Sequence, residues 1–183
     1  MEKKLGIIYS SVDGQTKKIA EALLQDLREQ KVAAKLYSIE DFEEQVTDFD
    51  LLIIGAGVRY GKHNIRVRKF VLNNKESLSR ITTAFFSVNL VARKSDRNSP
   101  GTNPYLIKFL KEVNWKPDFM AVFAGKLDYR AYSMLDRIMI KLIMKFTHGP
   151  TKSDTCIEYT NWESVREFGE LSLKQLKGAS SRY

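Results

Sequence analysis

The chain has 183 residues, a formal net charge of +8, 43% hydrophobic residues and 28% charged residues, values that fit one globular domain with a sizeable core. Its single cysteine, Cys156, excludes an internal disulfide, and two histidines, His63 and His148, are too few to suggest a zinc site. No apolar run approaches the roughly 18 residues of a membrane span, and the start of the chain does not resemble a secretion signal. We therefore expect a cytoplasmic protein that holds no metal.

The positive charge is unevenly distributed along the chain. Residues 1–50 hold 7 Lys or Arg against 11 Asp or Glu, so the basic surface belongs to residues 51–183. Such a surface suits nucleic acid, anionic lipid or an acidic small molecule, and charge alone does not choose among them.

The first predicted element is a buried strand followed by a polar turn and a helix. The apolar run at residues 5–9 suits a strand, and Ile19, Leu23 and Leu27 then recur at helical spacing. A helix therefore begins within residues 10–16.

The turn at residues 10–16 is predicted to bind phosphate. The first backbone N–H groups of a helix lack intrahelical partners and carry the positive end of the helix dipole, and Ser10, Ser11 and Thr16 add hydroxyl donors. Neither the nucleoside triphosphate motif Gly-x-x-x-x-Gly-Lys-[Ser/Thr] nor the dinucleotide motif Gly-x-Gly-x-x-Gly occurs there. A phosphomonoester is the remaining ligand, and a capped helix without ligand is the alternative.

The spacing Ile7-Ile8-Tyr9-x-Ser11-x-x-Gly14-x-Thr16-x-x-x-Ala20-x-x-Leu23 resembles the flavodoxin family signature. The resemblance implies flavin mononucleotide (FMN) as the cofactor. The residues implied to hold its phosphate are Ser10, Ser11, Val12, Asp13, Gly14, Gln15 and Thr16.

Four further strands are predicted in alternation with helices. They are residues 32–37, 50–55, 81–88 and 119–125. Strand 50–55 is apolar on both faces, as a central parallel strand requires. We expect an α/β flavodoxin-like three-layer sandwich with a five-stranded parallel sheet of order 2-1-3-4-5, and a ligand at the carboxyl ends of strands one and three.

Two loops and one glycine complete the expected flavin site. By the flavodoxin resemblance, the loops after the third and fourth strands flank the flavin ring. The implied flavin contacts are Gly57, Arg59, Tyr60, Gly61, Ser87, Val88, Asn89, Leu90 and Gly125.

Residues 126–146 add an apolar helix that a plain flavodoxin lacks. Ser133, Arg137, Lys141 and Lys145 are four residues apart and form a polar stripe, and almost all the other positions are apolar. The helix either packs deeply against the sheet, forms a dimer seam, or lies in a membrane interface where Arg137, Lys141 and Lys145 meet anionic headgroups.

The remaining segments complete one flavodoxin-like domain at residues 1–177 with an insertion at about 126–155. Residues 156–159 read as a resumed edge strand, and Thr160–Glu163 as a capping box that opens the last helix. Residues 178–183 are expected to form a disordered tail.

A closer resemblance covers nearly the whole chain. The residues Ser87–Lys94, Thr102-Asn103 with Tyr105, Ala124-Gly125 and Arg137–Lys145 look like the menaquinone-dependent protoporphyrinogen IX oxidases of bacterial haem synthesis. The resemblance implies FMN-dependent oxidation of protoporphyrinogen IX to protoporphyrin IX, with electrons passed to menaquinone or ubiquinone. It also implies peripheral binding to the anionic inner face of the cell membrane, no nucleic-acid partner, and room for a homo-oligomer.

No catalytic side chain is identified, because the flavin carries the chemistry. The candidates for contact with substrate propionates are Arg59, Arg93, Lys126 and Arg130, and Tyr129 lies near the expected rim. A flavodoxin-type electron carrier is one alternative, although carriers are usually acidic. An NAD(P)H:quinone reductase is the other, although no separate nicotinamide loop is found.

Overall fold

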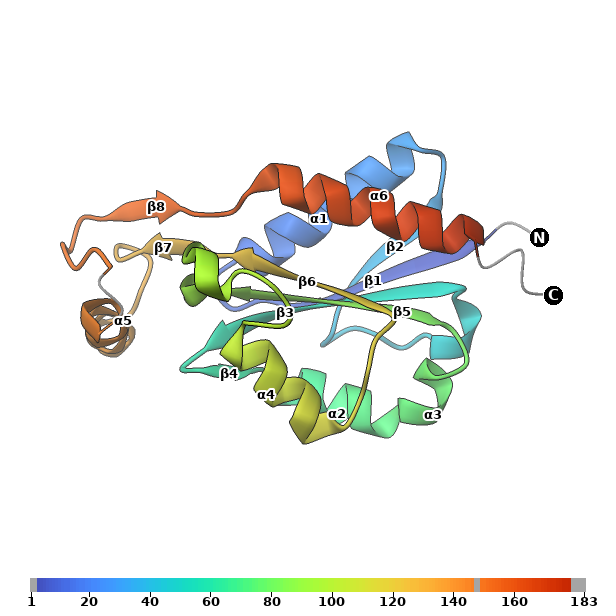
Figure 1. Cartoon of the computed structure of the whole chain (residues 1–183), viewed down its shortest axis with the longest axis horizontal. Coiled ribbons are helices and arrows are strands. Elements are labelled where there is room, and N and C mark those ends of the chain that lie inside the picture. The colour runs from blue at the N-terminus through green and yellow to red at the C-terminus, as the bar shows by residue number, and fades with distance from the viewer. Residues whose placement is uncertain (1–2, 147–148, 179–183) are drawn as a thin grey trace.

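A five-stranded parallel sheet carries the structure, a computed structural model that describes residues 3–146 and 149–178 (Figure 1). Its strands are β1 (Lys4–Ser10), β2 (Ala33–Ser38), β3 (Leu51–Arg59), β5 (Thr82–Asn89) and β6 (Phe119–Ala124). They lie in the order β2-β1-β3-β5-β6, and the short β4 (Lys62–His63) pairs antiparallel with the end of β3. The predicted order 2-1-3-4-5 is confirmed, since β4 is only a hairpin arm.

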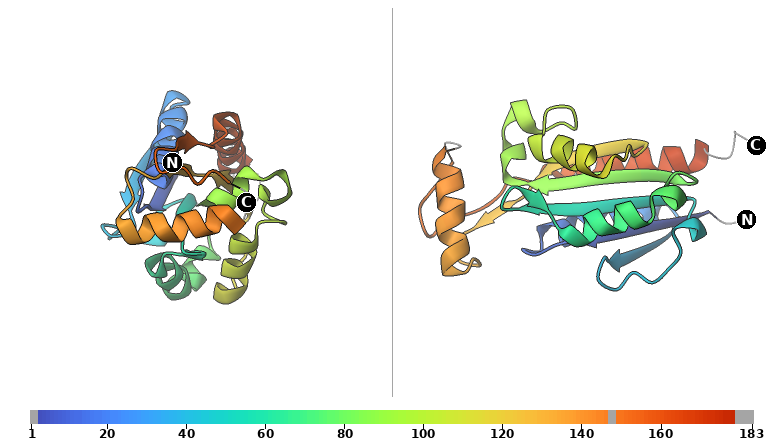
Figure 2. Two further views of the ribbon diagram at one scale, coloured as in Figure 1. Left: turned by 90° about the vertical axis from the view of Figure 1, so that its left-hand side faces the viewer. Right: turned by 90° about the horizontal axis from the view of Figure 1, so that it is seen from below.

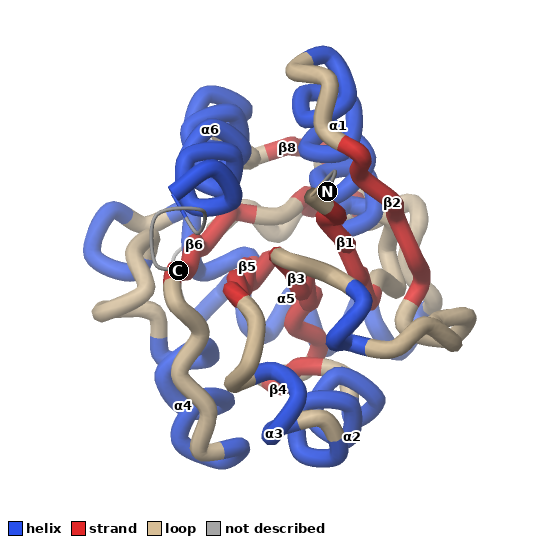
Figure 3. The backbone as a smooth tube through the Cα atoms, turned by 90° about the vertical axis from the view of Figure 1, so that its right-hand side faces the viewer, coloured by secondary structure: helices blue, strands red, loops and turns tan. Residues whose placement is uncertain are grey.

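The described residues form six α-helices, and all but the fifth cover the two faces of this sheet. They are α1 (Gln15–Glu29), α2 (Ile65–Asn73), α3 (Lys75–Leu78), α4 (Pro104–Val113), α5 (Met134–Phe146) and α6 (Trp162–Gly178). Short 3₁₀ turns occur at Val46–Asp48, Leu90–Arg93 and Ser95–Arg97. Helices α1 and α6 lie on one face and α2, α3 and α4 on the other, which gives the expected three layers (Figure 3).

Strand β3 is the centre of the hydrophobic core. Its residues Leu51 and Ile53 pack in the cluster beneath α1 and α6, whereas Leu52 and Ile54 pack in the cluster above α2 and α4. All four side chains are fully buried. Because both faces of the strand are covered, its continuous apolar run is the pattern that a central parallel strand needs.

The strand register brings four strand ends to one edge of the sheet. Ser10 of β1 pairs with Ala56 of β3, which pairs with Ser87 of β5. Farther along, Val88 of β5 pairs with Phe123 of β6. The loops that follow β1, β3, β5 and β6 therefore meet at this edge.

Beyond this edge stands a two-stranded ribbon with a separate helix. Strands β7 (Lys126–Asp128) and β8 (Cys156–Glu158) pair antiparallel and do not join the main sheet. Helix α5 follows β7 and lies across the end of the molecule, apart from the other helices (Figure 2). The prediction that residues 156–159 form an edge strand of the main sheet is wrong, because β8 pairs only with β7 among the described residues.

The start and end of α6 also differ from the prediction. The Asn161 side chain accepts hydrogen bonds from the backbone N–H groups of Glu163 and Ser164, so Asn161 caps the helix. Thr160 is buried instead, and its hydroxyl donates to the Ala124 carbonyl at 2.7 Å. Gly178, assigned to the tail, is the last residue of α6, and residues 179–183 lie outside the described part of the chain.

Candidate functional site

The turn between β1 and α1 presents an uncapped helix end. Gly14 is the N-cap residue, with φ of 85°, and no side chain caps the first N–H groups of α1. The Ser11 hydroxyl oxygen is buried and has no hydrogen-bond partner within the described residues. Because buried polar groups are nearly always hydrogen-bonded, this turn has the donors of an anion site.

The end of β3 forms the second wall. A Cβ atom on Gly57 would lie 2.9 Å from the Thr16 hydroxyl oxygen, so only glycine allows β3 to approach α1 this closely. Tyr60 and Gly61 have φ values of 50° and 74° and form the two-residue turn between Arg59 and Lys62. Positive φ at both central residues is the geometry of a tight hairpin turn.

The third wall is the loop after β5, and a buried amide pair fixes it. The Asn103 side chain donates to the Asn89 side-chain oxygen at 3.1 Å, and that oxygen also accepts the Ala92 N–H at 3.1 Å. The Asn89 side chain in turn donates to the Ser87 hydroxyl at 3.1 Å. The backbone of residues 87–92 is thereby held in one conformation.

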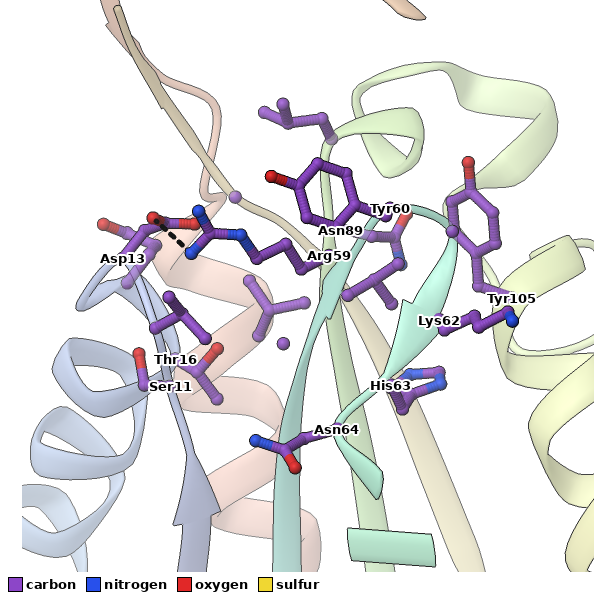
Figure 4. A pocket seen from close by; sticks show the side chains of 18 of the residues that line it. Ser11, Asp13, Thr16, Arg59, Tyr60, Lys62, His63, Asn64, Asn89 and Tyr105 are labelled. Atoms are coloured by element: carbon purple, nitrogen blue, oxygen red, sulfur yellow. Dashed lines mark ion pairs between the residues drawn. The ribbon is translucent and has the colours of Figure 1, made fainter. Parts of the chain in front are cut away.

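These three walls enclose a cavity of about 280 Å³ (Figure 4). Fourteen of the predicted flavin contacts line it: Ser10, Ser11, Val12, Asp13, Gln15, Thr16, Gly57, Arg59, Tyr60, Gly61, Val88, Asn89, Leu90 and Gly125. Gly14 and Ser87 do not line it, because Gly14 forms the cap of α1 and Ser87 is fully buried behind the wall. The structure thus brings one set of predicted residues together from four strand ends.

Other lining residues are not among the predicted flavin contacts. They include Val58, Lys62, His63, Asn64, Val91, Tyr105, Tyr132, Ile140 and Ile143. Tyr132, Ile140 and Ile143 belong to the α5 region, which folds back over the cavity. No local pattern in residues 126–146 marks the side that faces the cavity.

The predicted substrate contacts are scattered. Lys126 lines the cavity, and its ammonium group donates to Asp128 at 2.9 Å. Arg93 donates to the Leu90 carbonyl at 2.8 Å, and Arg130 is exposed; neither lines the cavity. Tyr129 is fully buried and its hydroxyl donates to the Pro150 carbonyl at 2.8 Å, so its position does not support the predicted substrate contact.

A carboxylate of α5 meets the cavity wall. Asp136 is only 8% exposed and accepts hydrogen bonds from the Arg59 guanidinium, the Tyr60 hydroxyl and, at 2.7 Å, the Ser133 hydroxyl. The hydrogen bond to Asp136 raises the pKa of Arg59. On the other side, Arg59 lies 3.7 Å from Asp13, whose pKa is raised by burial in spite of the opposing guanidinium charge.

Helix α5 turns its apolar face outward. Six large apolar side chains are exposed: Met134, Leu135, Ile138, Met139, Leu142 and Phe146. Of the three basic residues predicted to face a membrane, Lys145 is exposed, Arg137 is half-buried, and Lys141 is half-buried with its amine donating to the Ser153 hydroxyl at 2.6 Å. The deep-packing alternative for α5 is therefore wrong. Within the described residues, no helix is both long and apolar enough to cross a membrane.

Comparisons with known proteins agree with this geometry. The flavodoxin domain family matches residues 6–154. A protoporphyrinogen IX dehydrogenase [quinone] of Escherichia coli K12 is 42% identical, covering 88% of this chain and 90% of that protein. The protein of the same name from Leishmania major is 40% identical, covering 88% of this chain and 71% of that protein.

Solved structures show the same fold at low identity. The crystal structure of oxidised flavodoxin 1 from Bacillus cereus has a TM-score of 0.51 and 16% identity, covering 94% of this chain and 98% of that one. An archaeal flavodoxin also has a TM-score of 0.51, with 14% identity, covering 95% of this chain and 99% of that one.

His63 is a neutral imidazole at the cavity wall. Its Nε2 atom lies 2.9 Å from the Ser87 hydroxyl, and its ring packs against those of Phe85 and Phe109. Burial lowers its pKa from 6.5 to about 4. The folded chain therefore resists a proton that the unfolded chain accepts below pH 6.5.

The substitution His63→Gln should flatten the acid dependence of stability. Below pH 6.5 the unfolded wild type binds a proton at His63 that the folded state does not bind until about pH 4, so folding stability falls as the pH falls through this window. We expect the wild type to lose about 2 kcal/mol more than the variant between pH 7 and pH 5. Urea unfolding followed by circular dichroism measures the difference, and parallel curves would contradict it.

Proposed function

The chain belongs to the flavodoxin domain family, and from this premise we propose that it is a flavin-dependent oxidoreductase that oxidises protoporphyrinogen IX and passes the electrons to a quinone. The observation that carries the proposal is the 42% identity over 88% of the chain to an enzyme named for this reaction. The cavity at the carboxyl ends of β1, β3 and β5 supplies a site of the right kind, because ligands of open α/β sheets bind at such strand ends.

FMN is the proposed cofactor, with its phosphate in the turn at residues 10–16. Three features support the fit: the unpartnered Ser11 hydroxyl, the uncapped start of α1, and the close approach that Gly57 permits beside Thr16. None of these features involves a cationic side chain, as expected where backbone amides and the helix dipole stabilise the phosphate. When bound, the flavin accepts electrons from the porphyrinogen and delivers them to the quinone.

The remaining walls are proposed to position the flavin ring. The loop at residues 87–90 is held by the Asn89–Asn103 pair, so its backbone groups are fixed before a ligand arrives. The Tyr60–Gly61 turn is fixed by its pairing between Arg59 and Lys62. A preformed site of this kind avoids the entropy cost of ordering loops on binding.

Activity assays separate this function from the two alternatives. We expect the flavin-loaded protein to produce porphyrin fluorescence from protoporphyrinogen IX with menaquinone or ubiquinone under anaerobic conditions. A flavodoxin-type carrier would need a separate dehydrogenase, and an NAD(P)H:quinone reductase would oxidise NADPH with quinone. Porphyrin formation that is no faster than in protein-free buffer would sink the proposal.

The variant Ser11→Ala should separate flavin binding from folding. Loss of one charge-assisted donor weakens FMN binding by about 1.5 to 3 kcal/mol, whereas the stability of the apoprotein is unchanged or slightly raised because an unsatisfied buried hydroxyl is removed. Fluorescence titration and urea unfolding measure the two effects.

Two controls belong to this experiment. Riboflavin lacks the phosphate and should bind the wild type and Ser11→Ala equally. Ser79 directly follows α3, which lies at the opposite end of the sheet (Figure 1), so Ser79→Ala should not change the affinity for either flavin. If Ser11→Ala binds FMN as tightly as the wild type does, the proposed position of the phosphate in this turn is wrong.

The protein is proposed to bind the cytoplasmic face of the cell membrane through α5. The six exposed apolar side chains of this helix lie on the outer face, and Lys145 lies beside them. Burial of such a face at the headgroup boundary is favourable, and the net charge of +8 adds attraction to anionic lipid. The location suits the proposed reaction, because respiratory quinones reside in the bilayer.

The triple variant Leu135→Gln, Ile138→Gln, Leu142→Gln should release the protein from anionic phospholipid vesicles. We expect at least about tenfold weaker binding, since three buried apolar side chains are lost. Leu72→Gln, an exposed leucine on α2, is the matched control and should bind like the wild type. Unchanged vesicle binding contradicts the proposal. If the wild type and Leu72→Gln are dimers and the triple variant is a monomer, the apolar face of α5 binds a second copy of the chain instead.

A further inference from the structure

Arg59 and Tyr60 form a carboxylate-binding site in the cavity wall. Their guanidinium and hydroxyl groups donate to the two different oxygens of the Asp136 carboxylate. Both donors belong to the β3–β4 hairpin (Figure 4). Asp136 comes from α5. The hairpin pairing fixes the backbone of both donor residues without a contribution from α5.

The cavity is small for a small-molecule site. Its volume of about 280 Å³ lies just below the usual range of small-molecule sites, roughly 300–1,000 Å³. The proposed reaction needs a flavin and a tetrapyrrole in contact at the same place. The wall that can move without disturbing the core is the one formed by Tyr132, Ile140 and Ile143, because α5 stands outside the three layers.

The α5 wall has few anchors. Among the described residues of α5, only Asp136 and Met144 are buried. Met144 packs with Leu127, Tyr129 and Tyr132 beside the ribbon. The contacts of Asp136 are thus the polar attachment of the first part of α5 to the cavity wall.

Exchange of one carboxylate for another keeps the charges paired. Arg59 lies between Asp13 and Asp136, and a second carboxylate in place of Asp136 leaves the guanidinium with the same number of anionic partners. After release the Asp136 carboxylate keeps a partner, because the Ser133 hydroxyl of the same helix end donates to it at 2.7 Å. An acidic residue is also favourable in the first turn of a helix. An uncompensated buried charge, the usual obstacle to breaking such a pair, is avoided.

We infer that Arg59 and Tyr60 bind a propionate carboxylate of the tetrapyrrole substrate, and that Asp136 occupies this site as an internal substitute until the substrate displaces it. The inference rests on the proposed function for the identity of the ligand. Displacement releases the N-terminal part of α5 and opens space above the flavin site. Asp136 thus competes with the substrate, and Arg59 binds whichever of the two carboxylates is present.

The variants Asp136→Asn and Arg59→Gln separate this exchange from a simple lid. Both break the contact that holds α5. If α5 only blocked the cavity, both would bind substrate more tightly. If carboxylates exchange, Asp136→Asn binds more tightly and Arg59→Gln more weakly than the wild type.

The test measures binding of protoporphyrin IX, the product, and of its dimethyl ester by fluorescence quenching, in dilute detergent with saturating FMN. We expect Asp136→Asn to bind the free acid about tenfold more tightly than the wild type. This factor corresponds to a wild type in which Asp136 occupies the site about nine-tenths of the time. We expect Arg59→Gln to bind the free acid about tenfold more weakly. The dimethyl ester has no carboxylate for Arg59 to bind. Its affinity for the wild type should therefore be no higher than the affinity of the free acid for Arg59→Gln. Asp154→Asn is the matched control, because it removes an exposed carboxylate from the same region, and it should bind both porphyrins as the wild type does.

Each contrary result has one meaning. Tighter binding by both variants, unchanged binding by both, or equal binding of acid and ester overturns the exchange while the proposed function stands. A wild type that binds neither porphyrin overturns the proposed function. FMN affinity is measured for every variant. If Arg59→Gln no longer binds flavin, Tyr60→Phe replaces it, because Tyr60→Phe loses one donor and keeps the guanidinium. If Tyr60→Phe binds the free acid as tightly as the wild type does, the exchange is also overturned.

Discussion

The register between β1, β3 and β5 is the constraint on which the site depends. Ser10, Ala56 and Ser87 lie side by side across three strands, so the loops that follow them leave the sheet at one edge. A slip of one residue would turn every buried side chain of a strand to the opposite face. Since residues 51–56 of β3 are buried between two different helix layers, the core fixes the register and thereby the floor of the cavity.

Polar networks then hold the cavity walls. Thr160 joins the Ala124 carbonyl to the Gln15 side chain, and so ties the segment before α6 to the first turn of α1. Asn89 and Asn103 do the same for the loop after β5. In the described residues two buried side-chain atoms lack a partner, Arg137 Nε and the Ser11 hydroxyl. Of the two residues, Ser11 lines the cavity, where a donor without an acceptor is the condition expected of a ligand site.

The parts of the structure that could be predicted are those that local sequence determines. Continuous apolar runs identified the strands, and the hydroxyl-rich turn located the start of α1. The sequence does not predict the contacts of Thr160 and Tyr129, because each side chain bonds to a residue that lies far away in the sequence or outside its own element. Asp136 was missed for the same reason: its partners Arg59 and Tyr60 are about 76 residues away, and an acid in a first helical turn reads as ordinary capping.

The orientation of α5 follows from its partners rather than from its amphipathic pattern. Periodicity separates an apolar face from a polar one, but it does not say which face meets the protein. In this chain Asp136 faces the cavity wall and the six apolar side chains face outward, the reverse of an ordinary surface helix. The same helix is therefore both a wall of the cavity and the exposed apolar face. If a bilayer binds α5 more tightly when Asp136 has left Arg59, membrane binding must increase the affinity for substrate. By linkage, bound substrate must increase the affinity for the membrane by the same factor.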